Sequence, residues 1–237
     1  MQARIEEKLE VAKGTLLVAF DLLGETVDFI PGQYFWVTLL DAPYNDERGT
    51  RRHFSVVSSP NEHEKVAFCT RIRDSAFKRS LLELPVGAAA EVEPPKGTFL
   101  LPSDVDRPYV FLAGGIGITV FRSMLRYIAE EDLRHRITLV YSNRDAESTP
   151  FLKELQELEE ANPRFRLLLT MTDDPSWEGE HRRIGPELLR EHLGRSDLAS
   201  FDYLVAGPPS MVDGVVKGLH AAGVPEQRVR ADRFSGY

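Results

Sequence analysis

The sequence predicts a two-domain protein, in which an antiparallel β-barrel or sandwich precedes an α/β domain built on a parallel sheet. Three observations predict this order. The chain has 237 residues, which is room for two domains that each bury a core. Its first hundred residues contain short strand-like runs separated by turn formers. After Pro102, strand-like runs alternate with helix-like ones, a pattern typical of parallel sheets.

The first half is rich in Val, Phe, Thr and Tyr, and pairs such as Pro31-Gly32, Pro60-Asn61 and Pro94-Pro95 interrupt its apolar runs. Several strands at short spacing with such turns are typical of antiparallel barrels and sandwiches. One helical turn is expected at Phe77–Leu84. The predicted strands are Gly14–Phe20, Tyr34–Leu40, His53–Ser58, Lys65–Ile72 and Ala88–Glu93.

In the second half, strand-like runs alternate with helix-like runs. Right-handed crossovers between such elements give a parallel sheet that is covered on both faces. The predicted strands are Tyr109–Ala113, Arg136–Tyr141, Arg166–Met171, Phe201–Ala206 and Val229–Arg233. The predicted helices are Phe121–Glu130, Pro150–Glu160, Pro186–Leu193 and Met211–Ala222. The expected domains are residues 1–102 and 103–237, joined near Leu101–Arg107.

The amino-acid composition and net charge exclude several classes of protein. Hydrophobic content of 42% and charged content of 28% are those of an ordinary globular protein, and no apolar run approaches the roughly 20 residues of a membrane span. The net charge of −8 argues against a nucleic-acid binder. The single cysteine, Cys69, excludes an internal disulfide and a four-thiolate iron–sulfur cluster. The six histidines form no H-x-x-x-H pair, so we expect no metal site. The charged N-terminus does not resemble a signal peptide, and a cytoplasmic location is expected.

A glycine turn is the most informative feature of the second half. The apolar run from Tyr109 stops at Gly114-Gly115-x-Gly117, and an amphipathic segment follows at once. Glycines allow a ligand to approach the backbone, and a helix N-terminus offers unpaired N–H groups to a pyrophosphate. The third glycine of G-x-G-x-x-G is missing, and such turns also occur for purely structural reasons.

A second pattern, Arg52-His53-Phe54-Ser55, opens a first-half strand. Side chains at i and i+2 of a strand share a face, so Arg52 and Phe54 are expected to project together. A guanidinium can pair with a pyrophosphate, an aromatic can cover a planar ring, and a serine can hydrogen-bond a ring nitrogen. The alternative is a strand with one surface arginine and one core phenylalanine.

Taken together, these motifs resemble the ferredoxin–NADP reductase superfamily along nearly the whole chain and in the family's order. The matching stretches are PGQY (31–34), RHFS (52–55), PKGTF (95–99), AGGIGIT (113–119), LVYSNR (139–144), GPPSMV (207–212) and DRF (232–234). The resemblance implies a Greek-key flavin-binding barrel at residues 1–102 and a Rossmann-like NAD(P)-binding domain at residues 103–237. It also implies FAD, rather than FMN, as the bound flavin.

The resemblance assigns roles in the first domain. In the family, the arginine of the RHFS-type motif contacts flavin phosphates, the aromatic lies along the flavin and the serine hydrogen-bonds flavin N5, which corresponds to Arg52, Phe54 and Ser55. The stretch 75–78 lacks the family's glycine, which leaves the pyrophosphate position open, and a solvated helix face is the alternative for the cations beside it. The other implied flavin-binding residues are His53, Thr70, Arg71, Ile72, Lys78, Arg79 and Ser80.

In the second domain, Ser142, Asn143 and Arg144 are expected to face the adenosine ribose. Arg144 could pair with a 2′-phosphate or cover the adenine, so the choice between NADPH and NADH stays open with a lean to NADPH. Many family members have a cysteine where this chain has Ala206, which predicts retained but slower hydride transfer. The implied pyrophosphate-binding residues are Gly114, Gly115, Gly117 and Thr119; Ala206, Gly207, Pro208, Pro209 and Met211 complete the coenzyme set.

The C-terminus ends in an acid and two aromatics. By the family's pattern Phe234 stacks on the flavin face that the nicotinamide must reach, and Asp232 orients the nicotinamide side of the site. Tyr237 belongs to a short tail that is expected to fold over the same site. The alternative for Phe234 is packing of the last strand onto the core. Ser55, Asp232 and Phe234 are thus the expected catalytic residues.

The resemblance implies an NAD(P)H-dependent flavoprotein reductase that transfers a hydride from NAD(P)H to FAD. Because the sequence shows no iron–sulfur, haem or oxygenase domain, the expected acceptor is a separate ferredoxin, oxygenase component or cytochrome. The alternatives are an NAD(P)H-dependent reductase of free flavin or ferric complexes, and a non-catalytic flavoprotein subunit of a larger redox complex. The oligomeric state stays open.

Overall fold

The computed structural model describes residues 1–194 and 197–234, and the chain divides into two compact units. The first unit comprises Met1–Leu101 together with Thr119–Tyr127. The second comprises Pro102–Ile118 and the chain from Ile128 onward. Each unit has its own sheet.

The first unit is an antiparallel barrel-like sheet, as the sequence predicted. Its strands pair in the order β4-β3-β6-β1-β2-β5. The two ends of this order meet beyond β4, where the backbone N–H of Val57 donates to the carbonyl oxygen of Ala67 on β5 at 2.8 Å. The elements are β1 (Gln2–Ala12), β2 (Thr15–Asp21), β3 (Tyr34–Leu39), β4 (Arg51–Ser55), β5 (Lys65–Arg71), α1 (Ala76–Glu83) and β6 (Ala89–Val92).

The sequence prediction missed β1, the longest strand of this sheet. Only Ala3 and Ile5 are buried along its eleven residues, so its sequence shows charge rather than an apolar alternation. Pairing with β2 on one edge and β6 on the other specifies this strand. Such long-range pairing leaves little signal in the strand's own residues.

The second unit is a parallel sheet with crossover helices, as predicted. Within residues 102–194 and 197–234 its strands lie in the order β11-β10-β7-β8-β9, and every pair is parallel. The elements of this unit are β7 (Pro108–Gly114), a 3₁₀ turn η1 (Gly115–Gly117), β8 (Arg136–Asn143), α3 (Leu152–Ala161), β9 (Phe165–Met171), α4 (Pro186–Leu193), η2 (Leu198–Ser200), β10 (Asp202–Gly207), α5 (Pro209–Ala221), η3 (Glu226–Arg228) and β11 (Val229–Arg233). Helix α2 (Ile118–Glu130) follows η1 and belongs mostly to the first unit.

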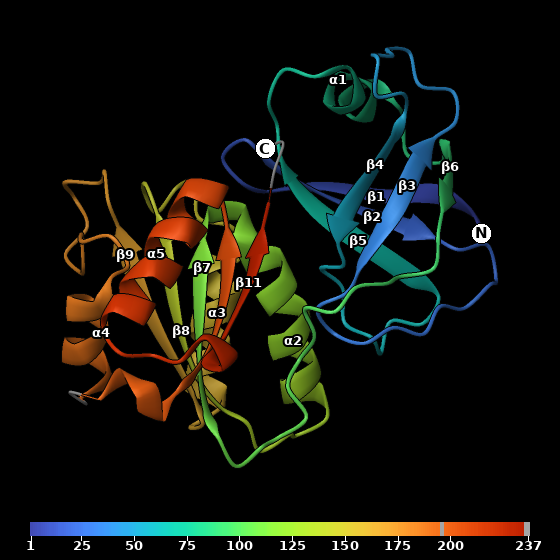
Figure 1. Ribbon diagram of the computed structural model, residues 1–237. Helices are drawn as coiled ribbons and strands as arrows, with labels where there is room; N and C mark the ends of the chain where they lie inside the picture. Colours follow the sequence, from blue (N-terminus) through green and yellow to red (C-terminus); the bar gives the residue numbers. More distant parts are fainter. Residues whose placement is uncertain (195–196, 235–237) are drawn as a thin grey trace. The chain divides into compact units, whose positions relative to one another are not determined.

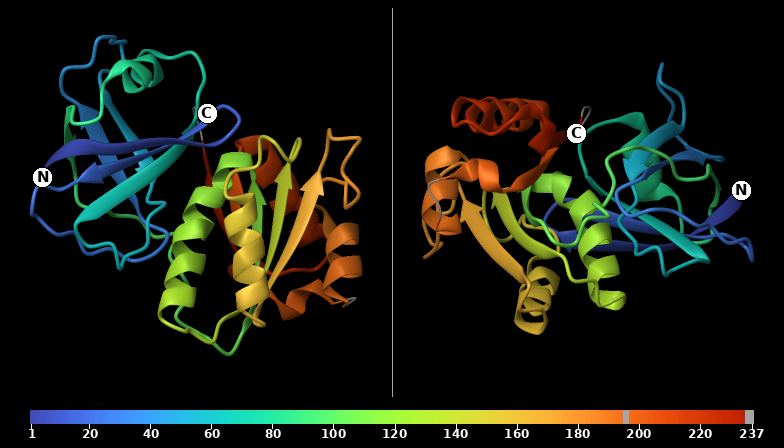
Figure 2. Two further views of the ribbon diagram at one scale, coloured as in Figure 1. Left: turned by 180° about the vertical axis from the view of Figure 1, so that it is seen from behind. Right: turned by 60° about the horizontal axis from the view of Figure 1, so that its bottom comes forward.

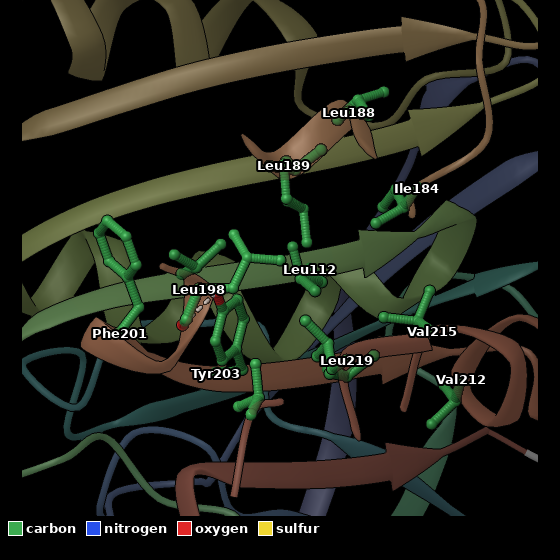
Figure 3. Close-up of a cluster of buried hydrophobic side chains, with 14 residues drawn as sticks. Leu112, Ile184, Leu188, Leu189, Leu198, Phe201, Tyr203, Val212, Val215 and Leu219 are labelled. Atoms are coloured by element: carbon green, nitrogen blue, oxygen red, sulfur yellow. Dashed lines mark hydrogen bonds between the residues drawn. The ribbon is translucent and has the colours of Figure 1, made fainter. Parts of the chain in front are cut away.

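Helices α4 and α5 pack on one face of this sheet, and α3 lies on the other (Figures 1 and 2). Figure 3 shows the core under α4 and α5, where Leu112 of β7 meets Leu189 of α4 and Leu219 of α5. The ring of Tyr203 is fully buried there, and its hydroxyl donates to the carbonyl oxygen of Leu198 at 2.9 Å. This packing fixes the strand ends that form the candidate coenzyme site.

Within residues 1–194 and 197–234, no helix combines the length and the apolar character needed to cross a bilayer.

Candidate functional site

The carboxyl edge of the parallel sheet brings most of the predicted coenzyme-binding residues together. Strand pairing places Gly114 beside Ser142, and Ala206 lies between Ala113 and Asp232. Ligands of open α/β sheets bind outside this edge. The predicted residues at or next to it are Gly114, Gly115, Gly117, Ser142, Asn143, Arg144, Ala206, Gly207, Pro208, Pro209, Met211, Asp232 and Phe234.

The glycines of this edge are required by the packing of the protein itself. A Cβ on Gly117 would lie 2.2 Å from the carbonyl oxygen of Ala206. Gly207 has φ +155°, and its Cβ would lie 3.1 Å from the carbonyl oxygen of Gly114. The turn after β7 therefore packs directly against the end of β10, which brings the start of α2 to the sheet edge.

Asn143 ends β8 with a buried and unsatisfied amide. The residue is 6% exposed, and neither Oδ1 nor Nδ2 has a hydrogen-bond partner within the described residues. Buried side-chain amides in folded proteins normally have partners, so such a group calls for a bound water or ligand. Asn143 therefore fits a polar ligand held at this edge.

The turn that follows β9 adds charged residues that the sequence prediction missed. Beyond β9, the backbone N–H of Thr172 donates to the carbonyl oxygen of Asn143 at 2.9 Å, and that of Asp173 donates to the carbonyl oxygen of Arg144 at 2.8 Å. Arg144 and Asp173 are both exposed. The carboxylate of the next residue, Asp174, accepts from Ser176 and from the backbone of residue 146, which lowers its pKa. The carboxylate-bearing residue Asp173 therefore lies next to Arg144, the one charged residue that the sequence prediction had assigned to the ribose site.

The last described residues also reach this edge. Asp232 pairs with Ala206 across β11 and β10, and burial raises the pKa of its carboxyl group. The backbone N–H of Phe234 donates to the carbonyl oxygen of Gly207 at 2.9 Å, and its side chain is buried. Stacking of Phe234 on a flavin stays a prediction from the resemblance, and Tyr237 lies outside the described residues. Thr119 is buried in the first turn of α2.

In the first unit, Arg52 and Phe54 of β4 both lie near the Phe77 ring, with 5.5 Å from the guanidinium carbon to the ring centroid and 5.7 Å between the two phenylalanine ring centroids. The Phe54 ring is buried and stacked on Phe68, with centroids 3.9 Å apart and an interplanar angle of 7°. His53 is exposed and packs beside Trp36, with ring centroids 4.7 Å apart, while Ser55 is half-buried. Burial, and then the charges of nearby arginines, lower the pKa of His53. Phe54 thus lies in the core, but the Arg52 side chain is only 14% exposed and is not the surface arginine of the alternative interpretation. The flavin contact of Phe54 stays a prediction.

Arg52 is held by the loop that precedes it. Its Nη2 lies 2.9 Å from both carboxylate oxygens of Asp46. Its Nη1 donates to the carbonyl oxygens of Arg48, Gly49 and Arg51 at 2.8–3.0 Å. The guanidinium carbon also lies 5.5 Å from the centroid of the Phe77 ring on α1. Arg52, the residue predicted to bind the flavin phosphates, therefore lies beside α1.

The start of α1 is a cationic cluster. Ser75 caps the helix, with its hydroxyl accepting from the backbone N–H of Lys78 at 3.3 Å, and the first turn contains no acidic residue. The Lys78 side chain is buried, and burial, followed by the charge of Arg73, lowers its pKa to about 8. Such a buried cation at a helix start fits a phosphate group. Burial disfavours the charged ammonium, and a bound anion would stabilise it. Ser80 is buried and Arg79 is exposed in the same helix.

At the end of β5, backbone groups of residues 71 and 72 pair with other parts of the barrel. Thr70 is buried, and the backbone N–H of Ile72 donates to the carbonyl oxygen of Gly14 at 2.8 Å. Arg71 pairs with Thr15 of β2. Backbone contacts from 70–72 to a flavin ring remain a prediction.

Other candidate features lie outside both sites. Among the described residues, no three His, Cys, Asp or Glu side chains cluster as metal ligands. Burial raises the pKa of the Cys69 thiol to about 12, so this thiol is unreactive. A cavity of about 550 Å³ between α4 and α5 contains none of the predicted cofactor-binding residues; its lining includes Arg182, Arg183, Pro186, Arg190, Gly218 and Ala222.

Comparisons with known proteins agree with this geometry. Residues 111–217 match the family described as the oxidoreductase NAD-binding domain. The chain is 27% identical over 248 residues to the anthranilate 1,2-dioxygenase electron transfer component of Acinetobacter baylyi, covering 96% of this chain and 68% of the relative. Across its curated relatives the chain spans between 52% and 68% of their length.

Solved structures share the whole fold. A ferredoxin–NADP⁺ reductase from Neisseria gonorrhoeae with bound FAD and NADP superposes with a TM-score of 0.82 at 20% identity, covering 98% of both chains. An Amycolatopsis cytochrome P450 reductase gives a TM-score of 0.82 at 23% identity, covering 99% of this chain and 70% of that chain. At these identities the likeness establishes the two-domain fold.

Proposed function

We propose that this chain, whose residues 111–217 match the oxidoreductase NAD-binding family and whose fold is shared with a ferredoxin–NADP⁺ reductase, is an FAD-dependent NAD(P)H oxidoreductase. In this proposal the barrel of residues 1–102 binds FAD, and the α/β domain of residues 103–237 binds NAD(P)H. A separate acceptor receives the electrons. Since the proposed coenzyme is a metabolite of the cell interior, a cytoplasmic location is part of the proposal.

The observation that carries the proposal is the carboxyl edge of the parallel sheet. It combines a glycine turn, the start of a long helix, and the buried amide of Asn143 without a partner among the described residues. A dinucleotide would match these groups, because its pyrophosphate can accept from the N–H groups at the helix start and its ribose hydroxyl groups can hydrogen-bond the amide. Asp232 and Ala206 lie beside one another at the same edge, where the resemblance locates the nicotinamide.

The first unit offers a matching donor set for FAD. Lys78, Arg79 and Ser80 lie in α1, and Arg52 lies beside that helix. Guanidinium and ammonium groups are the usual partners of a pyrophosphate. When bound, FAD supplies a ring that accepts a hydride and releases electrons one or two at a time. In this chain Ser55 is proposed to hydrogen-bond the ring, and Asp232 to orient the nicotinamide.

The acceptor is proposed to be a protein rather than a small molecule. The relative from Acinetobacter baylyi is named as the electron transfer component of a dioxygenase, and a structural neighbour is named as a cytochrome P450 reductase. An oxygenase component, a ferredoxin or a cytochrome would be a comparable partner for this chain. Reduction of free flavin or ferric complexes is the competing activity.

Spectroscopy and steady-state kinetics test the proposal directly. The purified protein should be yellow, contain about one FAD per chain, and oxidise NADH or NADPH in the presence of an acceptor. Ferredoxin, cytochrome c, free FMN and a ferric chelate should be compared as acceptors at equal concentration. A protein that binds neither flavin nor coenzyme would refute the proposal. Turnover with free FMN alone would favour the competing activity.

A further inference from the structure

Residues 41–50, which lie in the loop between β3 and β4, contact several predicted flavin-binding residues of the first unit. One contact is the ion pair between Asp46 and Arg52, with both carboxylate oxygens 2.9 Å from Nη2. The side chain of Arg52 is only 14% exposed and that of Asp46 is 34% exposed. Because Nη1 donates to three carbonyl oxygens of residues 48, 49 and 51, the loop surrounds this end of the guanidinium.

The same loop is attached to α1 through Tyr44. The backbone N–H of Tyr44 donates to Ser80 Oγ at 3.0 Å, and Ser80 Oγ donates to the carbonyl oxygen of Tyr44 at 3.0 Å. The Tyr44 hydroxyl donates to Glu83 Oε1 at 2.7 Å, and the Arg79 guanidinium carbon lies 4.9 Å from the Tyr44 ring centroid. The loop thus occupies groups on Arg52, Arg79 and Ser80.

Little of the loop is packed into the core. Residues 45–48 are all exposed, and beside its pair with Arg52 the Asp46 carboxylate accepts from the backbone N–H of Arg48 at 2.8 Å. Gly49 closes this turn at φ +67°, with open space around its Cβ position. A segment with so few buried contacts can rearrange without unfolding the barrel.

We propose that residues 41–50 form a strap in which Asp46 occupies the position on Arg52 that the pyrophosphate of FAD takes. This inference rests on the proposed function. A carboxylate and a phosphate both accept paired N–H groups from one guanidinium edge, so Arg52 cannot give that edge to both. FAD therefore displaces Asp46 when it binds, and Asp46 returns when FAD leaves. Asp46 weakens the retention of FAD and accelerates its release.

The test compares Asp46→Asn with Glu47→Gln, which removes an equal charge from the neighbouring exposed position of the same loop. FAD and riboflavin, which has no phosphate, are titrated into flavin-free protein, and flavin fluorescence reports binding. FAD release from the loaded protein is followed after dilution. Because the Asp46 pair is partly exposed, Asp46→Asn is expected to tighten FAD binding and slow its release by about fivefold. Riboflavin affinity and the Glu47→Gln protein should be unchanged.

The outcomes separate the strap from the proposed function. Wild-type protein that binds neither flavin refutes the function itself. Wild-type protein that binds FAD, together with an Asp46→Asn protein of unchanged or weaker FAD affinity, refutes only the strap; the weaker affinity would show that Asp46 positions Arg52 for the phosphate. Equal tightening in Glu47→Gln would also refute the strap, because net charge would then explain the effect. Circular dichroism of both variants checks that the barrel is folded.

Discussion

Lys78 is a buried cation at the start of α1, and its titration provides a pH-dependent test of the flavin site. Burial lowers the pKa of its ammonium group to about 8. The anionic pyrophosphate of FAD favours the charged form, so affinity should be full below pH 8 and fall as the pH rises through 8. Titration of flavin-free protein with FAD between pH 7 and 9.5 measures this.

Lys78→Met is the control for this titration, because it keeps the length of the side chain and removes the charge. Its FAD affinity should be weaker at pH 7 and independent of pH over the same range. A wild-type profile that is flat from pH 7 to 9.5 would show that Lys78 does not contact the phosphate. Lys78 would then belong to a helix face without a ligand, the alternative that the sequence also allowed.

Arg144 and Asp173 are neighbouring opposite charges at the ends of β8 and β9, joined through a backbone hydrogen bond of 2.8 Å. If a 2′-phosphate binds there, Arg144→Ala should raise the KM for NADPH more than that for NADH. Asp173→Asn should lower the KM for NADPH, by up to about fivefold for an exposed charge. Added salt should weaken both effects. Equal effects on the two coenzymes would show that Arg144 covers the adenine instead.

Some residue-scale features could be predicted from the sequence, and others could not. The Gly114–Gly117 turn was predicted because an apolar run ends in glycines before an amphipathic run. The Phe54–Phe68 stack and the Asp46–Arg52 pair were not predicted. The first joins two different strands, and the second involves a loop without periodicity. Contacts of this kind depend on tertiary structure rather than on local pattern.

At the scale of elements, buried strands were more predictable than exposed ones. Strands β7 and β10 are continuous apolar runs because both faces of a parallel sheet are covered, and both were predicted. Strand β1 alternates charged residues with few buried ones, so its pairing with β2 and β6 was not evident. The backbone contacts of Thr172 and Asp173, in the turn after β9, with the end of β8 were missed because these residues are polar and exposed.

The packing of the β7 turn against β10 makes a prediction about stability. Gly117→Ala places a methyl group 2.2 Å from the carbonyl oxygen of Ala206, so the turn or the strand end must shift. We expect a loss of about 1–3 kcal/mol in the free energy of unfolding. Urea denaturation followed by circular dichroism measures it.

Gly214→Ala is the matched control, since Gly214 lies inside α5 with nothing within 4 Å of its Cβ position. It should stabilise the protein by about 0.5–1 kcal/mol through its helix propensity. Equal stability changes in the two variants would contradict the inferred close packing. Loss of coenzyme binding in Gly117→Ala without loss of stability would instead indicate a glycine needed mainly by the ligand.

At the scale of the whole molecule, the change from strands to strand–helix alternation after Pro102 predicted two sheets of different kinds, and both are present. The grouping of Thr119–Tyr127 with the first unit was not predictable from a boundary along the chain. Within this unit α2 is hydrogen-bonded to the chain that follows β4: Ser123 Oγ donates to the carbonyl oxygen of Ser58 at 2.7 Å, and Arg122 Nη1 donates to that of Val57 at 2.8 Å. Periodicity reveals an element but not the element's partners.

If each unit binds its own ligand, the two ligands should protect different parts of the chain from amide hydrogen exchange. FAD should slow exchange in peptides that cover β4 and α1, because a ligand adds its binding free energy to the opening of the segments it contacts. At a concentration 100 times its Kd, this amounts to about 2.7 kcal/mol. NADP⁺ or NAD⁺ alone should protect the turn after β7 and the ends of β8 and β10, and leave β4 unchanged. Exchange measured by mass spectrometry with each ligand in turn distinguishes these footprints. FAD protection confined to the second unit would contradict the assignment of flavin to the barrel, whereas protection of β4 and α1 would place the cationic cluster of Lys78 and Arg79 in contact with the flavin.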